Sequence, residues 1–175
     1  MPQVGPESGH ADHYRSYRLG IANGILFAIG LAFVDPVTVL PTFVSRLTDS
    51  ELAIGLVSVI GSSGWFLPQI FAASYLQAQP YNRPLYVFSA IVRGTGWLLA
   101  VPSLLLLVPG HPAAALAAFF VCYSLYAFGG GLSGVAFLNV VARTVPANRL
   151  GAFFGNRQFW GSLGAIGCGA LVRAV

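Results

Sequence analysis

The sequence has very little charge for its length. Charged residues make up 8% of its 175 residues, whereas soluble proteins contain about 25%. Between Glu51 and Arg143 only Arg83 and Arg93 carry a formal charge. Hydrophobic residues make up 56% of the chain, so its composition excludes an ordinary soluble domain and is typical of membrane proteins.

Motifs for catalysis and cofactor binding are missing as well. The three His residues lie outside the long apolar runs, and these runs contain no zinc-protease motif and no Ser/His/Asp grouping. The sequence has no phosphate-binding P-loop, and Cys122 and Cys168 lack CxxC spacing and are expected to be small packing residues. We therefore expect no enzymatic activity, no metal and no cofactor, and any transport would be secondary.

The nine basic residues are scattered singly, most of them at the edges of apolar runs, so the net charge of +4 does not indicate a nucleic-acid partner. Arginines in short membrane loops are retained on the cytoplasmic side. Arg15 and Arg18 precede the first run, Arg83 follows the second, and Arg143 and Arg149 lie between the fourth and the fifth. This pattern predicts a cytoplasmic N-terminus, and we expect an integral protein of a bacterial inner membrane.

Five apolar runs follow one another along the chain, at residues 19–44, 52–78, 85–108, 113–142 and 150–175. A hydrocarbon core about 30 Å thick needs about 20 apolar helical residues, whereas a tilted barrel strand needs only about 9–11 and alternates in polarity. The sequence therefore predicts an all-α, polytopic transmembrane helical bundle of about five spans in a lipid bilayer. Residues 1–18 are predicted to be a polar cytoplasmic tail and residues 19–175 the transmembrane domain.

Small residues recur at the spacing that lets membrane helices approach closely. The first run has Gly20 and Gly24 in GxxxG spacing; the predicted packing glycines of the later runs are Gly130, Gly134, Gly151, Gly155, Gly161 and Gly169. One interpretation is that these glycines only assemble the bundle. The other is that helices packed through glycine can slide against each other, as alternating access in a transporter requires.

Asp35 is the only acidic residue within an apolar run, and it directly precedes Pro36. A carboxylate at membrane depth is costly unless it is paired or hydrated, and Pro36 would free a backbone carbonyl one turn earlier. One hypothesis is that Asp35 faces a water-filled cavity and binds a cation, a proton or a substrate amine. The alternative is that Asp35 lies at the outer interface.

Arg93 and Arg157 each lie about eight or nine residues inside a run, which is about 12–14 Å from the cytoplasmic end. Such side chains can snorkel to the interface or pair inside the bundle. Because Asp35 can neutralise at most one of them, an anionic substrate group is a further possible partner.

Arg157 belongs to the triplet Asn156-Arg157-Gln158. Three consecutive helical residues point about 100° apart, so at least one is expected to face a cavity or another helix. The candidate residues for binding a substrate or ion are Asp35, Asn23, Arg157, Gln158, Tyr126 and Asn139.

The order of loops, the proline-marked first run and the sequence Arg149-Leu150-Gly151 before a glycine-rich fifth run resemble the N-terminal half of a major facilitator superfamily transporter. Of the charged signature that this family has after its second span, only Arg83 is present, and the family's Gly-Pro pair in the fifth span is absent. The resemblance implies about twelve spans in two six-helix halves, with a small-molecule substrate bound between them.

On this interpretation the chain is a fragment of a secondary transporter, and the missing C-terminal half of the same protein is its partner. The first, second, fourth and fifth spans would line the path. The alternative is a small five-span scaffold or accessory subunit without transport activity. A membrane enzyme ranks third, because the runs lack clustered acid–base groups.

Overall fold

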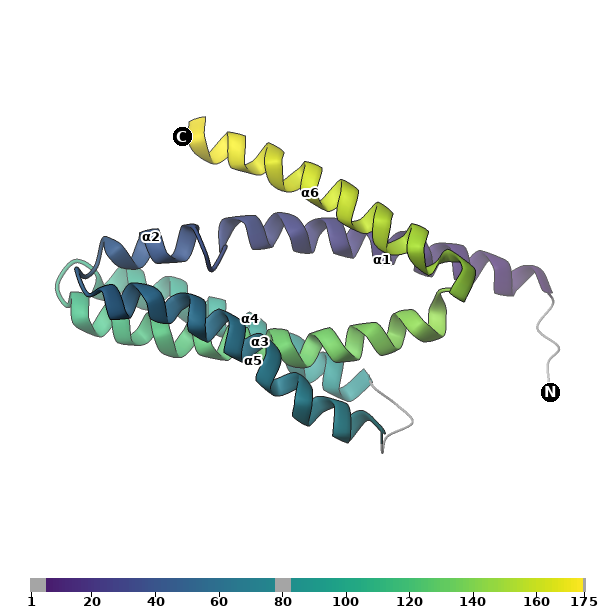
Figure 1. Cartoon of the computed structure of the whole chain (residues 1–175), viewed down its shortest axis with the longest axis horizontal. Coiled ribbons are helices and arrows are strands. Elements are labelled where there is room, and N and C mark those ends of the chain that lie inside the picture. The colour runs from purple at the N-terminus through teal and green to yellow at the C-terminus, as the bar shows by residue number, and fades with distance from the viewer. Residues whose placement is uncertain (1–5, 78–82, 175) are drawn as a thin grey trace. The chain divides into compact units, whose positions relative to one another are not determined.

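A computed structural model describes residues 6–77 and 83–174, and within them every regular element is a helix (Figure 1). The prediction of an all-α fold is therefore confirmed. The chain divides into two compact units, the first formed by Met1–Asp35 and Val140–Val175 and the second by Pro36–Asn139. The elements are α1 (Pro6–Phe33), α2 (Val39–Ser45), α3 (Glu51–Gln77), α4 (Arg83–Leu107), α5 (Pro112–Thr144), the short 3₁₀ helix η1 (Ala147–Arg149) and α6 (Leu150–Ala174).

Among the described residues, three helices are long and apolar enough to cross a membrane. They are the segments Glu51–Ala72 of α3, Pro84–Leu107 of α4 and Pro112–Ala142 of α5. Even the shortest of them, with 22 residues, is about 33 Å long and matches a hydrocarbon core of about 30 Å. The apolar part of α1, Tyr17–Phe33, is shorter, and α6 is not among the three. The count of five spans therefore stays a prediction.

Large apolar side chains point outward from these helices. Leu52 is 81% exposed, Leu98 76% and Leu106 79%. Water would make such surfaces costly, because each buried apolar side chain gains about 1.5–3 kcal/mol over an exposed one. Lipid removes this cost, so the exposed leucines agree with a membrane location.

The first predicted run, residues 19–44, is not one continuous helix. α1 ends at Phe33 and α2 begins at Val39. Pro36 lacks an N–H group, clashes with a helical turn before it and disfavours helical geometry at Asp35. The Pro36 carbonyl instead accepts a hydrogen bond from Ser58 Oγ of α3, at 2.9 Å. Neighbouring helices are known to satisfy backbone groups freed by proline in this way.

α1 also begins earlier than the sequence predicts. It starts at Pro6, within the segment predicted to be a polar tail, while residues 1–5 lie outside the described part. The predicted loop at residues 79–84 lies mostly outside it too. α4 ends at Leu107 and α5 starts at Pro112, on either side of the Pro-Gly break.

In the first unit, α1 and α6 lie side by side and run in the same direction (Figure 1). Gly20 contacts the ring of Phe153, Gly24 contacts Arg157, and Gly161 contacts Ala28. Each contact therefore advances by four residues on both helices. This is the parallel small-residue packing that allows membrane helices to approach closely.

In the second unit, α5 packs against both α3 and α4. Gly131 of α5 approaches the α3 backbone so closely that a Cβ there would lie 2.7 Å from the Gly64 carbonyl oxygen. On the α4 side, a Cβ on Gly96 would lie 2.8 Å from the Cys122 carbonyl oxygen. Ser133 Oγ of α5 and the fully buried Ser89 Oγ of α4 are hydrogen-bonded at 2.8 Å.

The contacts also give the helix directions within each unit. α3 runs parallel to α5, since Gly64 contacts Ala127 and Gln69 lies near Gly134 further along both helices. α4 runs antiparallel to α5: Gly96 contacts Cys122, whereas Arg93, which is earlier on α4, contacts Gly129, which is later on α5. Within each unit these directions are the ones that successive crossings of a membrane would produce.

Candidate functional site

A cavity of about 770 Å³ lies between α1 and α6 in the first unit. We call this cavity the α1–α6 groove. On one side it is lined by Gly24, Phe27, Ala28, Leu31 and Ala32 of α1 and by Asp35, which follows α1. On the other side it is lined by Phe154, Arg157, Gln158, Ser162 and Ala165 of α6. Three of the six predicted binding residues, Asp35, Arg157 and Gln158, are thus brought together in one cavity.

Arg157 reaches the groove by crossing the backbone of α1 at Gly24. A Cβ built on Gly24 would meet Cγ, Cδ and Nε of Arg157. The absence of a side chain at Gly24 therefore lets the stem of Arg157 lie against α1 while the half-buried side chain lines the groove. Its guanidinium provides planar donors that can bind a carboxylate through two hydrogen bonds.

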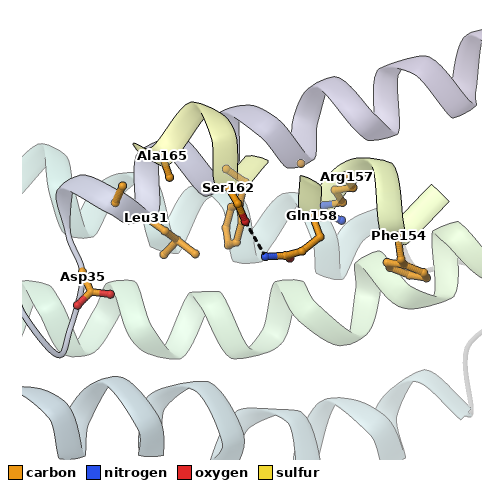
Figure 2. Close-up of a pocket in the computed structure, with 11 residues that line it drawn as sticks. Leu31, Asp35, Phe154, Arg157, Gln158, Ser162 and Ala165 are labelled. Atoms are coloured by element: carbon orange, nitrogen blue, oxygen red, sulfur yellow. Dashed lines mark hydrogen bonds between the residues drawn. The ribbon is translucent and has the colours of Figure 1, made fainter. Parts of the chain in front are cut away.

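Gln158 and Ser162 form a second polar feature on α6. Gln158 Nε2 donates a hydrogen bond to Ser162 Oγ, at 3.2 Å, as Figure 2 shows. Both side chains line the groove, so this bond fixes the orientation of the Gln158 amide there. The carbonyl oxygen of that amide is an acceptor and its second N–H a donor for a bound molecule.

Asp35 lies at the other end of the groove from Arg157 (Figure 2). Since Gly24 contacts Arg157 and Ala28 contacts Gly161, Asp35 lies beyond Ala165 in the same register. Asp35 follows the end of α1 and is half-buried. The two charges of the groove are thus placed at separate positions along its length.

Tyr126 belongs to the second unit, where it contacts Arg93, the other arginine that lies deep inside an apolar run. Arg93 Nη2 donates a hydrogen bond to Tyr126 Oη at 3.2 Å, and the guanidinium carbon lies 4.8 Å from the centre of the tyrosine ring. Trp97 and Tyr123 flank the same ring, with centroid distances of 5.3 and 6.3 Å. Arg93 is therefore held by an aromatic cluster, through a cation–π contact and a hydrogen bond.

The remaining predicted binding residues are not among those lining the groove. Asn23 is exposed on α1, and Asn139 is half-buried on α5 in the second unit. The predicted roles of these residues stay predictions.

The predicted packing glycines divide into two groups. Gly161 faces Ala28, and a Cβ built on Gly130 or Gly134 would lie 3.1 or 3.6 Å from the ring of Trp65. A Cβ on Gly151, Gly155 or Gly169 would meet nothing within 4 Å. The last three therefore face open space in the described structure.

Sequence reasoning did not single out Ser162. A signal was available, because Ser162 lies four residues after Gln158 and residues at this spacing share one helix face. The pairing of Arg93 with Tyr126 was also missed. Arg93 and Tyr126 are 33 residues apart in sequence, and only the antiparallel register of α4 and α5 brings them together.

In comparisons with known proteins, no family model, no curated protein and no solved structure matches this chain. Within the described residues, no group of three or more His, Cys, Asp and Glu side chains could hold a metal ion. Cys122 and Cys168 are not joined in a disulfide. The α1–α6 groove, with its two charges and its amide, is the candidate functional site of this part of the chain.

Proposed function

We propose that this chain is part of a secondary transporter for a small solute, with the α1–α6 groove lining the substrate path. The observation that carries the proposal is the presence of Asp35, Arg157 and Gln158 in one cavity of an otherwise apolar chain. Charged groups are costly at membrane depth and mark substrate or ion pathways when they line cavities. The proposal includes ion or proton coupling and alternating access of the kind found in the major facilitator superfamily.

The way α1 packs on α6 supports this proposal. Gly20, Gly24 and Gly161 carry the contacts, so the two helices approach each other closely through small residues. Alternating access requires movement of helices around a fixed binding site. In the proposed protein, a second half with further spans completes the path, and the N-terminus lies on the cytoplasmic side of a bacterial inner membrane.

The first experiment reads the coding frame beyond Val175 and expresses the whole frame. Further apolar spans there support the transporter, whereas a stop codon favours the five-span accessory subunit and contradicts the proposal. The expressed protein is then reconstituted into vesicles with an imposed proton gradient, and pooled solutes are screened for gradient-dependent uptake or efflux.

Two variants connect transport to the groove. Asp35→Asn and Arg157→Gln are expected to abolish gradient-dependent transport while membrane insertion is retained, because each removes one charge of the groove. Arg149→Gln is the matched control, since Arg149 is exposed in η1 and does not line the groove. Full transport by both groove variants would contradict the proposed path.

A further inference from the structure

The α1–α6 groove carries one positive and one negative group, separated along its length. Arg157 crosses α1 at Gly24, nine residues before that helix ends at Phe33, which corresponds to about 14 Å of helix rise, and Asp35 lies just beyond that end. Figure 2 shows the carboxylate of Asp35 at one end and Arg157 at the other, with Leu31 and Ser162 between them.

The stretch between these charges is mainly apolar. Its α1 side is formed by Phe27, Ala28, Leu31 and Ala32, and its α6 side by Ser162 and Ala165. Such a lining favours a hydrocarbon chain, at about 25 cal/mol per Å² of apolar surface removed from water, and penalises a charge at the same place. A molecule that fits the groove therefore carries its charged groups at its ends.

The two ends select opposite charges. The guanidinium of Arg157 offers donors in a planar fork, and the Gln158 amide beside it has hydrogen-bonding capacity beyond its bond to Ser162. An ionised Asp35 only accepts hydrogen bonds, and so it suits an ammonium group.

We infer that the groove binds an elongated zwitterion, with its carboxylate at Arg157, its ammonium group at Asp35 and its hydrocarbon chain along the apolar middle. This inference rests on the proposed function, because it takes the same groove as the substrate site. A compact zwitterion such as glycine is too short to reach both ends.

The test uses the protein of the whole coding frame in lipid nanodiscs and measures binding by calorimetry. The probes are ω-aminocaprylate, caprylate and octylamine, which share one chain length and differ in their terminal charges, together with glycine. Charge-assisted hydrogen bonds contribute about 1.5–3 kcal/mol, so ω-aminocaprylate is expected to bind about 10-fold to 100-fold more tightly than either singly charged probe. Glycine is expected to bind more weakly than ω-aminocaprylate.

Variants assign each charge to its residue. Arg157→Gln is expected to make ω-aminocaprylate bind no more tightly than octylamine. Asp35→Asn is expected to make it bind no more tightly than caprylate. Arg157→Lys keeps the positive charge and is expected to keep part of the preference for ω-aminocaprylate over octylamine. This variant can be measured instead if Arg157→Gln does not fold. Arg149→Gln, outside the groove, is expected to bind all four probes like the unaltered protein.

The possible results distinguish the failure of the inference from the failure of the proposed function. Equal binding of the three probes of one length, or unchanged preferences in the folded variants, overturns the inference. Transport of another solute that still depends on Arg157 and Asp35 overturns the substrate class and leaves the proposed function standing. Charge-selective binding without any gradient-dependent transport overturns the proposed function and leaves the binding site standing.

Discussion

Arg157 of α6 lies directly across Gly24 of α1, so closely that a Cβ at residue 24 would meet the aliphatic stem of the arginine. This contact packs α6 against α1, and it also positions the charged side chain of Arg157 in the groove. Packing and proposed function are therefore coupled at this pair, and the first prediction uses that coupling.

Gly24→Ala is expected to displace Arg157 from its position against α1. Because the overlap includes Cγ of Arg157, the whole arginine stem has to shift, so we expect a loss of stability of about 1–3 kcal/mol and about a tenfold loss of ω-aminocaprylate binding, measured by calorimetry in nanodiscs. Gly30→Ala on the same helix is the control, since a Cβ there meets nothing within 4 Å. Equal effects of the two substitutions on binding would contradict the role of the Gly24 contact.

Gly161→Val is expected to separate α1 from α6. A Cβ at residue 161 would lie 2.8 Å from the Ala28 Cβ, and a larger side chain makes the overlap worse. Overpacking of this kind costs about 1–3 kcal/mol, measured as a lowered midpoint of thermal unfolding in a fixed detergent. Gly155→Val makes the same chemical change where a Cβ meets nothing within 4 Å, and it is expected to have little effect. If Gly155→Val destabilised the protein as much, the observed α1–α6 packing would be wrong.

Tyr126→Phe is expected to weaken the attachment of Arg93 without removing it. The substitution deletes the hydroxyl that accepts the 3.2 Å hydrogen bond and keeps the ring 4.8 Å below the guanidinium. We expect a loss of about 1 kcal/mol in resistance to denaturing detergent, and a larger loss for Tyr126→Leu, which also removes the cation–π contact. Tyr86→Phe, at an exposed position, is the control. Identical losses for Phe and Leu at residue 126 would exclude the cation–π contribution.

Ser89→Ala is expected to destabilise the second unit modestly. Ser89 is fully buried and its hydroxyl links α4 to Ser133 of α5 at 2.8 Å, while Ser133 Oγ also lies 2.9 Å from the Gly129 carbonyl oxygen of its own helix. Because Ser133 keeps that second acceptor, the loss should be close to the average for side-chain bonds between membrane helices, about 0.6 kcal/mol. Ser124→Ala is the control, since Ser124 is exposed and bonds only within α5 in the contacts described. Detergent unfolding curves compare the two, and no difference between them would contradict the Ser89–Ser133 link.

The helical fold could be predicted from the length of the apolar runs, because no other element satisfies its own backbone over such lengths in lipid. α6 begins at Leu150, where the fifth run was predicted to begin. The gap between Phe33 and Val39 was harder to predict. Pro36 is compatible with either a kink or a break in the helix. The hydrogen bond from Ser58 to the Pro36 carbonyl supports the break, and such a tertiary contact is not visible in the sequence.

The candidate site was partly predictable for a similar reason. Asp35, Arg157 and Gln158 stand out as polar residues in apolar surroundings, whereas their common cavity depends on the register of α1 against α6. Small-residue spacing identified Gly151 and Gly155 as readily as Gly161, yet of these three only Gly161 contacts α1 in the described structure. Spacing predicts which residues share one helix face. It does not predict which helix packs against that face, because this also depends on the sequence of the second helix.

The central claim is that the α1–α6 groove lines the substrate path. Because such a path must admit water, cysteine accessibility tests this claim most directly. Cys122 and Cys168 are first replaced by Ala, and Cys is then introduced at Ala165 in the groove or at the adjacent Ile166, which is 70% exposed on an apolar surface. The protein of the whole coding frame is treated in membranes with a charged, membrane-impermeant thiol reagent. The account predicts rapid labelling at residue 165 and little at residue 166. Labelling of residue 166 alone, or of neither, would contradict it.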